Sequence, residues 1–325
     1  MKALLSTAPG GPETLALTEL PDPIAGPGQL LVRVKACAIN YPDVLIIEDK
    51  YQFKPLRPFA PGGEIAGIVE AVGEGVEGWA PGDRLIAMIG HGGLAEKVVV
   101  QAAMALPLPP ERSFEDGSAL ILTYATSIHA LLDRGRLEAG QTLLVLGAAG
   151  GVGTAAIQIG KILGARVIAA ASTDAKCDLC REIGADATIN YASGDVRAEI
   201  KRLTDGKGPD VVYDPVGGDL AEPVFRSIAW RGRYLVVGFA QGGIPALPLN
   251  LALLKGASIV GVFWGEFARR EPAAHARALA QLAGWYGEGK VKPVIDARLP
   301  MHELPAAYAR MGSRQVRGKL VMTNG

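Results

Sequence analysis

The order of hydrophobic and polar positions divides the chain into two kinds of pattern. Residues 1–110 contain short β-like runs separated by turn signals such as Pro27-Gly28 and Pro81-Gly82. The runs read "QLLVRVKACAI", "EIAGIVEAVG", "DRLIAMI" and "AEKVVVQ". This part of the chain is therefore predicted to form a small, all-β, barrel-like unit.

From about Ser113 onward, apolar strands alternate with helical segments. The predicted strands are "QTLLVLG", "RVIAAAS", "DATINY", "DVVYDPVG", "RYLVVGF" and "SIVGVFW". Continuous apolar runs are typical of strands buried on both faces, so we predict a parallel sheet covered by helices on both sides. After about residue 290, "KPVIDARLP" and "GKLVMT" predict a return to the first unit. The expected α/β architecture has domains at residues 1–114, 115–289 and 290–325.

A glycine-rich loop follows the first of these strands. It reads "GAAGGVG", and a helical pattern begins directly after it. Gly150 and Gly153 occupy the second and third glycine positions of the dinucleotide fingerprint, and Ala148 replaces the first. A side chain at Gly150 would keep a pyrophosphate from the backbone amides, and the helix N-terminus favours phosphate. We therefore predict a dinucleotide site that includes Gly150, Gly151 and Val152.

The end of the next strand distinguishes between the two nicotinamide dinucleotides. NAD sites usually place Asp or Glu there, whereas this strand ends in Ser172-Thr173, with Lys176 one helical turn later. A hydroxyl and an ammonium suit a 2′-phosphate and favour NADP, although Asp174 would repel phosphate unless it points away. The alternative is that the hydroxyls cap a helix and Lys176 is a solvated surface charge.

Composition and charge narrow the range of partners. The 325 residues carry 33 basic and 33 acidic side chains, which gives no electrostatic reason to expect nucleic acid or an anionic membrane. No apolar run approaches the ~20 residues of a membrane span. Three cysteines are too few for a disulfide framework and indicate a reducing compartment, by default the cytoplasm. Cys177 and Cys180 have redox or zinc spacing but lie in a helical pattern, which favours ordinary helix residues.

Several long, collinear motifs resemble the quinone oxidoreductase (zeta-crystallin-like) branch of the medium-chain dehydrogenase/reductase superfamily. They are "AINYPDVLIIEDKYQFKPLRPFAPGGEIAGIVEAVG", "GDRLIAMIGHGGLAEKVVV", "LTYATSIHALLDRGRLEAGQTLLVLGAAGGVG", "YDPVGG" and "GKLVM". The resemblance implies a GroES-like catalytic domain, split between both ends of the chain, and a Rossmann domain. It also implies NADPH as hydride donor and usually a homodimer.

The chain departs from the zinc alcohol dehydrogenases of the same superfamily at two positions. Those enzymes carry a catalytic Cys where this chain has Asn40, and a His where it has Gly63. Asn and Gly do not replace the thiolate and imidazole ligands of zinc, so we expect no metal. Without a Lewis acid, the expected acceptor is already electrophilic, as a quinone or an α,β-unsaturated carbonyl is.

Candidate site residues follow from residue type and family position together. Asn40, Tyr41 and Tyr51 are the catalytic candidates; the alternatives are a turn-forming Asn and ordinary packing tyrosines. Asp43 matches a recurrent family Asp, with a structural or a catalytic role. The cofactor candidates, beyond those already named, are Thr123, Tyr191, Gly238, Phe239, Phe263, Trp264 and Lys319.

The predicted function is zinc-independent, NADPH-dependent quinone reduction. The first alternative is a 2-enoyl reductase acting on an enone or an acrylyl-CoA-like thioester, for which Arg269-Arg270 is the candidate basic groove. The second is a non-catalytic NADPH-binding structural or regulatory protein. We expect a small electrophilic substrate and no nucleic-acid or membrane partner. The strand in "KGASIVGVFWG" either extends the sheet across a dimer axis or is buried.

Overall fold

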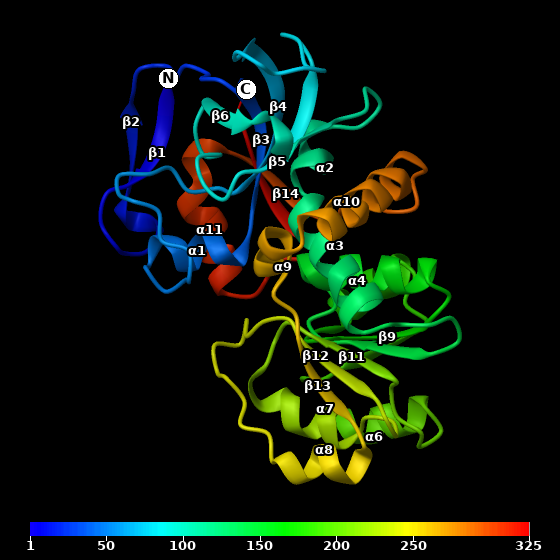
Figure 1. The fold of residues 1–325 in the computed structure, drawn as a ribbon. Helices are drawn as coiled ribbons and strands as arrows, with labels where there is room; N and C mark the ends of the chain where they lie inside the picture. Colours follow the sequence, from blue (N-terminus) through cyan, green and yellow to red (C-terminus); the bar gives the residue numbers. More distant parts are fainter. Residues whose placement is uncertain (325) are drawn as a thin grey trace. The chain divides into compact units, whose positions relative to one another are not determined.

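The computed structural model describes residues 1–324, which form two compact units (Figure 1). Unit 1 combines Met1–Leu122 with the segment from Pro293 onward, and unit 2 comprises Thr123–Lys292. Gly325, with which the predicted third segment ends, lies outside the described residues. Unit 1 is thus built from two stretches of chain that are separated by the whole of unit 2.

Unit 1 is organised around a seven-stranded sheet in the order β14-β15-β3-β4-β5-β7, with β6 also paired to β3. The strands are β3 (Gln29–Ile39), β4 (Glu64–Val72), β5 (Arg84–Met88), β6 (Lys97–Gln101), β7 (Ala105–Pro107), β14 (Ile295–Pro300) and β15 (Lys319–Thr323). All pairs are antiparallel except β14 with β15. The four strands predicted in the first part of the chain and the two predicted after residue 290 are confirmed.

Shorter elements complete unit 1. They are the hairpin of β1 (Lys2–Ser6) with β2 (Leu15–Glu19), and helices α1 (Tyr41–Ile47), α2 (Phe114–Ser118) and α11 (Leu304–Gly312). The core contains Leu30, Val32 and Val34, which alternate along β3, together with Leu304 of α11. This period of two places one face of the strand in the interior.

Unit 2 contains a six-stranded sheet in the order β10-β9-β8-β11-β12-β13, and every pair in it is parallel. The strands are β8 (Thr142–Val145), β9 (Arg166–Ala171), β10 (Ala187–Asn190), β11 (Val211–Asp214), β12 (Arg233–Val236) and β13 (Ser258–Gly261). The predicted parallel sheet is confirmed. Because its strands are parallel, the residues that follow them gather along one edge.

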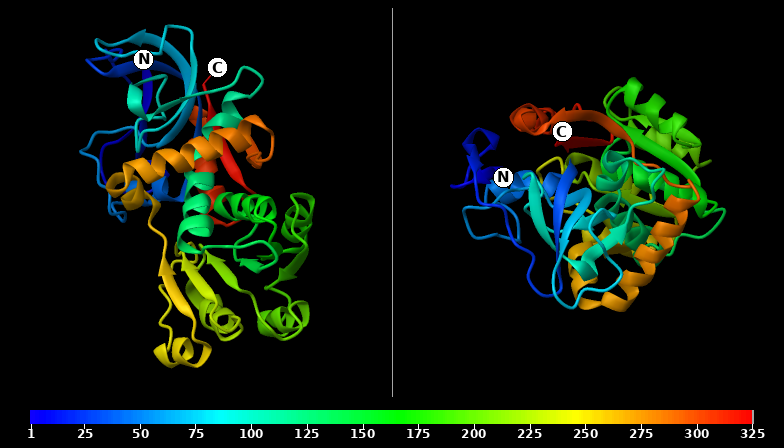
Figure 2. Two further views of the ribbon diagram at one scale, coloured as in Figure 1. Left: turned by 45° about the vertical axis from the view of Figure 1, so that its right-hand side comes forward. Right: turned by 90° about the horizontal axis from the view of Figure 1, so that it is seen from above.

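Helices lie on both faces of this sheet (Figures 1 and 2). The helices of this part of the chain are α3 (Ile121–Ile128), α4 (Gly151–Ile162), α5 (Asp174–Glu182), α6 (Val196–Leu203), α7 (Ala221–Arg226), α8 (Leu249–Lys255), α9 (Trp264–Arg270) and α10 (Pro272–Gly287). Alternate residues of one strand serve the two faces: Leu144 shares a core with Val224 and Phe225 of α7, whereas Leu143 lies against Gly160 of α4. Strands with apolar residues on both faces therefore appear as continuous runs in the sequence.

The segment His129–Arg134 is a π-helix that continues α3. Its i to i−5 pattern is seen where the Gly135 N–H donates to the Ala130 carbonyl at 2.6 Å. Such segments are rare and short, and sequence periodicity carries no signal for them. His129 is 6% exposed and stacks on Phe267 with 4.0 Å between ring centroids, so its ring packs within unit 2.

None of the helices within residues 1–324 combines the length and apolar character needed to cross a membrane.

Candidate active site

The glycine loop of unit 2 connects β8 to α4 and has the backbone geometry of a phosphate cradle. Gly147 adopts a φ of +56°, which glycine tolerates best, and α4 begins at Gly151. A Cβ on Gly150 would approach only the Gly147 carbonyl, at 3.3 Å, so the space above this residue is open. A Cβ on Gly153 would lie 2.5 Å from the same oxygen and 2.7 Å from Ala148 Cα. Gly150 therefore leaves room for a ligand, and Gly153 for the close packing of the helix on the loop.

The end of β9 carries the residues predicted to choose the dinucleotide. Thr173 caps α5 by accepting the Lys176 N–H at 3.3 Å, which agrees with the capping alternative for this hydroxyl. Asp174 accepts a hydrogen bond from Asn190 Nδ2 at 2.8 Å, so its carboxylate is bound to the end of β10. Ser172, Lys176 and Tyr191 are all half-buried.

The ends of the remaining strands hold the other candidates of unit 2. Gly238 and Phe239 follow β12, Phe263 follows β13, and Trp264 is the first residue of α9. Phe239 is 37% exposed and Phe263 51%, so both rings have free surface. Thr123 lies within α3 and is buried.

A buried carboxylate organises the turn after β11. Asp214 accepts the backbone N–H groups of Val216 and Gly217 at 2.8 and 2.9 Å, and the Tyr234 hydroxyl at 2.5 Å. Burial and the nearby Asp214 carboxylate raise the pKa of Tyr234, which therefore stays a hydrogen-bond donor. These contacts fix the loop whose Val216 side chain lies beside Gly147 of the glycine loop.

Together, the strand ends of unit 2 suit a nicotinamide dinucleotide. The open space at Gly150 and the unpaired first-turn N–H groups of a helix are what a pyrophosphate requires. Ser172, Lys176 and Tyr191 would hold the adenosine end. The assignment of individual residues to the cofactor stays a prediction.

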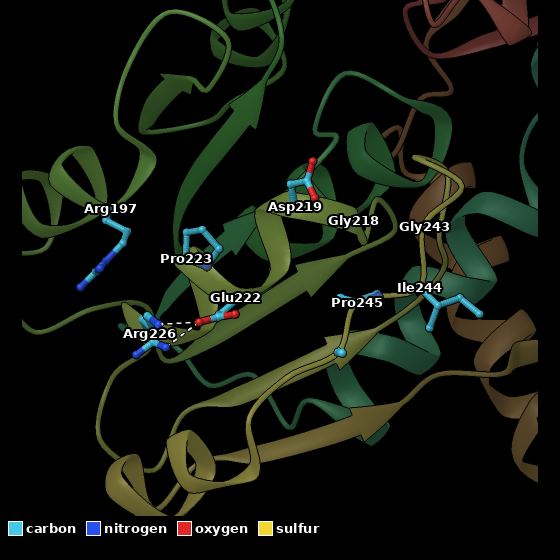
Figure 3. A pocket seen from close by; sticks show the side chains of 10 residues that line it. Arg197, Gly218, Asp219, Glu222, Pro223, Arg226, Gly243, Ile244 and Pro245 are labelled. Carbon is cyan, nitrogen blue, oxygen red and sulfur yellow. Dashed lines mark hydrogen bonds and ion pairs between the residues drawn. The ribbon is translucent and has the colours of Figure 1, made fainter.

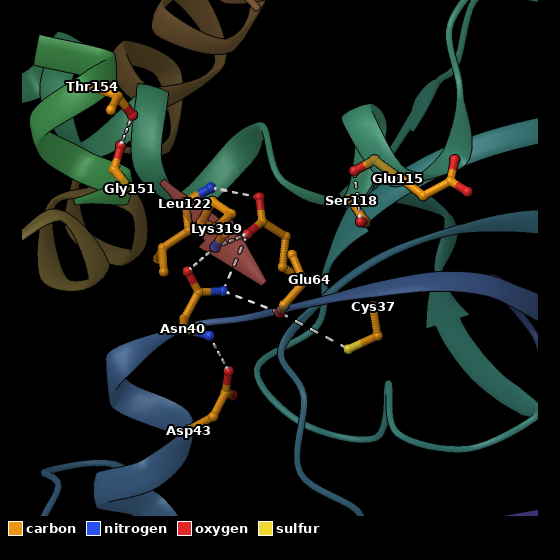
Figure 4. Close-up of polar contacts among 11 residues, drawn as sticks. Cys37, Asn40, Asp43, Glu64, Glu115, Ser118, Leu122, Gly151, Thr154 and Lys319 are labelled. Atoms are coloured by element: carbon orange, nitrogen blue, oxygen red, sulfur yellow. Dashed lines mark hydrogen bonds and ion pairs between the residues drawn. The ribbon is translucent and has the colours of Figure 1, made fainter. Parts of the chain in front are cut away.

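Unit 1 contains a cluster of polar side chains that are almost completely buried (Figure 4). Asn40 is 6% exposed, Glu64 0% and Lys319 5%. The Lys319 ammonium donates to Asn40 Oδ1 and pairs with Glu64 Oε2 at 3.2 Å, while Asn40 Nδ2 donates to the same Glu64 oxygen at 3.1 Å. The second carboxylate oxygen of Glu64 accepts the Leu122 N–H at 3.0 Å. We call Asn40, Glu64 and Lys319 the polar cluster.

Sheet register explains why these three residues meet. Leu320 of β15 is paired with Ile39 of antiparallel β3, which places Lys319 opposite Asn40. On the other side of β3, Glu64 is paired with Ala38. Two predicted site residues, Asn40 and Lys319, are thus brought into direct contact.

Asp43 lies beside the polar cluster in the first turn of α1. Its Oδ2 accepts the N–H of Asn40, the N-cap residue of α1, at 2.7 Å, so Asp43 is part of the capping box of this helix. Burial raises the pKa of Asp43 to about 6, although the N–H groups of Asn40 and Gly63 and the Lys319 charge favour its ionised form. Tyr51 is half-buried, and burial together with Asp43 raises its pKa, whereas Tyr41 is 40% exposed.

The remaining polar candidates have ordinary structural partners. Cys37, Cys177 and Cys180 are buried free thiols, and the latter two lie on α5, so the predicted helical setting is confirmed. Arg269 and Arg270 both pair with Glu266, at 2.8 and 2.6 Å, which neutralises part of the basic character expected of a CoA groove.

A groove of about 550 Å³ lies beside η4 (Gly218–Leu220) and α7 (Figure 3). Its lining combines Arg197, Asp219 and Ile244 with the ion pair of Glu222 and Arg226. Among the described residues, those that line it include none of the predicted cofactor contacts. The groove and the predicted dinucleotide site therefore share no residues.

Comparison with known proteins identifies both parts of the chain. Residues 26–110 match the alcohol dehydrogenase GroES-like domain, and residues 151–281 match the zinc-binding dehydrogenase family. The quinone oxidoreductase-like protein 2 homolog of Nematostella vectensis is 37% identical over 91% of this chain and 82% of its own length. The chain belongs to the quinone oxidoreductase branch of the medium-chain dehydrogenase/reductase superfamily.

Two solved structures resemble this branch member over its full length. The quinone oxidoreductase of Thermus thermophilus, solved alone and with NADPH, is 33% identical with a TM-score of 0.86 and complete coverage of both chains. A structure described as an NAD-dependent alcohol dehydrogenase is also 33% identical, with a TM-score of 0.91 and complete coverage of both chains. The GroES-like and Rossmann architecture predicted from the sequence is confirmed.

The donor set of this branch member does not suit a catalytic zinc. Position 63 is a glycine, and a Cβ there would lie 2.9 Å from the Gly90 carbonyl oxygen. Asn40 offers an amide, and Glu64 is already paired with the Lys319 ammonium. Within residues 1–324 no three His, Cys, Asp or Glu side chains are grouped as metal ligands. The cation beside Glu64 is the ammonium group of Lys319, not a metal ion.

Sequence reasoning missed two contributors to these sites. Glu64 was not a predicted site residue, and its contact with Lys319 depends on pairing across three strands. Asp214 lies in the quoted motif "YDPVGG", but its bond to Tyr234 is equally non-local. For both Glu64 and Asp214, the sequence does show an acidic residue in an otherwise apolar strand. This pattern indicates a buried carboxylate, which needs hydrogen-bond or charge partners.

Proposed function

We propose that this protein is an NADPH-dependent, zinc-independent quinone oxidoreductase. The observation that carries the proposal is the polar cluster, in which an ammonium, rather than a set of metal ligands, lies beside Asn40 and Glu64. Bound NADPH supplies the hydride which, with one proton from water, converts a quinone to a hydroquinone and leaves NADP⁺. The similarity to relatives named quinone oxidoreductase also supports quinone reduction.

The residues of unit 1 have separate tasks in this proposal. Among the described residues the Lys319 ammonium has two partners, so one of its three N–H groups is left for an acceptor oxygen on which negative charge develops. Asn40 and Glu64 fix the position of that ammonium. Tyr51 has a raised pKa and stays protonated, so its hydroxyl can donate a hydrogen bond to the acceptor oxygen that takes its proton from water. Tyr41 offers an exposed ring face.

The choice of NADPH over NADH rests on the end of β9. Lys176 and Ser172 provide the charge and the hydroxyl that a 2′-phosphate requires. The carboxylate that opposes this assignment, Asp174, is bound by Asn190 at 2.8 Å. The hydrogen bond gives this carboxylate a protein partner and so reduces its repulsion of phosphate.

A panel of acceptors tests the proposal. NADPH and NADH oxidation is measured with 1,4-benzoquinone, 9,10-phenanthrenequinone, crotonyl-CoA and acrylyl-CoA, with and without added zinc or chelator. We expect turnover of quinones with NADPH and no effect of zinc or chelator. Activity confined to the thioesters would establish the 2-enoyl reductase alternative. Tight NADPH binding without turnover of any acceptor would establish a non-catalytic binding protein.

We also propose a homodimer formed through β13. This strand is paired only with β12, so its outer edge is free within the described chain (Figure 2). Exposed apolar side chains lie on α8, the helix that precedes β13, and beside Gly256 at its end: Leu249 is 79% exposed, Leu253 80% and Trp230 70%. The Leu253→Glu variant should be monomeric by light scattering, while Leu56→Glu, at a 93% exposed position in unit 1, should leave the mass unchanged. Equal masses for Leu253→Glu and the natural chain would contradict this interface.

The three buried free thiols support a cytoplasmic location, because reducing compartments keep such groups unpaired.

A further inference from the structure

The loop Ile89–Gly92 lies directly beside the position where this chain lacks a zinc ligand. The N–H groups of Ile89 and Gly90 donate to the Gly63 carbonyl at 2.7 and 3.3 Å, and the Gly92 N–H donates to Ala60 at 2.7 Å. Gly90 and Gly92 have φ angles of +80° and +105°, a conformation in which other residues are strained. The backbone on both sides of His91 is therefore fixed.

His91 packs within an aromatic group formed by Phe53 and Phe59. Its ring is stacked on Phe53, with 5.9 Å between centroids and 25° between planes, and meets Phe59 edge-on at 5.7 Å and 70°. The Arg57 guanidinium lies 5.5 Å from the Phe59 centroid. Burial lowers the pKa of His91, so a neutral imidazole takes part in this stack.

Phe53 differs from Phe59 because it is not buried in the core. It is 46% exposed although His91 holds it, and a Cβ on Gly90 would lie 3.6 Å from its ring. Tyr51, two residues earlier, has its pKa raised by burial and by the negative charge of Asp43, which lies beside the polar cluster. Phe53 therefore offers an immobilised, accessible aromatic face on a loop that adjoins the candidate catalytic residues of unit 1.

We propose that Phe53, positioned by His91, is the aromatic wall against which a planar acceptor lies, and that it selects polycyclic over monocyclic quinones. The proposal rests on the proposed quinone reduction and adds its substrate class. An aromatic pair contributes about 0.5–1.5 kcal/mol beyond area burial, which corresponds to roughly a twofold to tenfold change in affinity. A second or third fused ring gives the acceptor more surface to place on Phe53.

Steady-state kinetics of matched variants test this wall. The acceptors are 1,4-benzoquinone, 1,4-naphthoquinone and 9,10-phenanthrenequinone. Phe53→Ala should raise KM for the tricyclic quinone by about twofold to tenfold, leave KM for benzoquinone within about twofold and leave kcat unchanged. Leu56→Ala, a nearby exposed position, should change none of these values.

Two substitutions at His91 separate positioning from general stability. His91→Ala should raise KM for 9,10-phenanthrenequinone in the same direction as Phe53→Ala, and His91→Phe should restore it because the stack is kept. An equal rise of KM for all three quinones in Phe53→Ala would overturn the wall, as would a fall in kcat alone.

A binding measurement keeps this test separate from the proposed activity. Calorimetry of 9,10-phenanthrenequinone with the NADP⁺-loaded protein involves no turnover. Binding weakened by about twofold to tenfold in Phe53→Ala supports the wall even if the natural chain reduces no quinone. Unchanged binding in Phe53→Ala, together with normal quinone turnover by the natural chain, refutes the wall and leaves the proposed function intact.

Discussion

The strand ends of unit 2 and the polar cluster of unit 1 solve different physical problems. At the strand ends, Gly150 leaves open space at the N-terminus of α4, where we predict a ligand to bind. In the polar cluster, Asn40, Glu64 and Lys319 pair with one another away from water. The strand ends are predicted to gain binding capacity from open space at the N-terminus of α4, whereas the polar cluster gains a fixed charge by pairing its members.

This difference has consequences for mutation. Changes at the strand ends should alter ligand binding more than folding, because the groups concerned face open space. Changes in the polar cluster should alter folding first, because removing one partner leaves a buried charge without compensation.

Removal of the Lys319 ammonium should have the largest effect. Lys319→Met leaves Glu64, which is fully buried, without its counter-charge, and we expect a loss of about 3–5 kcal/mol in the free energy of unfolding. Urea titration followed by circular dichroism measures it. The matched control is Lys97→Met, whose ion pairs with Asp22 and Glu70 lie at the surface and should cost about 0–1 kcal/mol. A similar loss of unfolding free energy in Lys319→Met and Lys97→Met would contradict a special role of the buried ion pair.

Asp43 should give the cluster a pH-dependent stability. Its pKa rises from 3.8 to about 6 on folding, so the folded state binds the proton more tightly and stability from this group is lost as pH rises from about 4 to 6. A shift of about two units corresponds to roughly 3 kcal/mol. The stability of Asp43→Asn relative to the natural chain should therefore increase across this range, as measured by urea titration at each pH. A constant difference would show that Asp43 does not titrate there.

Two glycines of the same loop should separate binding from packing. Gly153→Ala places a Cβ 2.5 Å from a backbone oxygen and should destabilise unit 2 by about 1–3 kcal/mol. Gly150→Ala has a φ of −82° and a nearest contact of 3.3 Å, so it should fold normally and yet weaken NADPH binding at least about tenfold. Thermal unfolding and fluorescence titration measure the two effects. Normal NADPH affinity in Gly150→Ala would contradict the phosphate cradle.

The smallest expected effect concerns the choice of dinucleotide. Lys176→Ala should weaken NADPH binding by about tenfold, near 1.4 kcal/mol, and leave NADH unchanged. Asp174→Ala should act in the opposite direction, with a gain in NADPH affinity of about twofold to threefold, because one negative charge is removed. Fluorescence titrations with both dinucleotides measure the change in selectivity. Equal losses for NADPH and NADH in Lys176→Ala would count against a 2′-phosphate contact.

The strand ends of unit 2 could be predicted from the sequence, whereas the contacts within the polar cluster of unit 1 could not. The six strands of unit 2 and the loop at Gly150 depend on neighbouring residues, so apolar runs and glycine spacing were enough to find them. Asn40 was found through its family position. The partnership of Asn40 with Glu64 and Lys319 depends on the register of β15, β3 and β4, which local patterns do not encode.

The aromatic wall was unpredictable for a related reason. His91 and Phe53 lie within the quoted motifs, but neither was a predicted site residue. Their stacking requires that two separate loops meet, at positions set by the positive φ angles of Gly90 and Gly92. Both residue types are common in loops, so neither carries a signal alone.

The position of β15 also affects how the protein is made. This strand lies between β14 and β3 in the sheet of unit 1, yet the ribosome synthesises it after all of unit 2. Until β15 inserts, β3 lacks one neighbour and Glu64 lacks the ammonium of Lys319. A nascent or prematurely terminated chain therefore presents an unfinished sheet edge and an uncompensated carboxylate, which are features that chaperones and proteases can act on. In this way Lys319 couples synthesis of the segment after unit 2 to formation of the polar cluster.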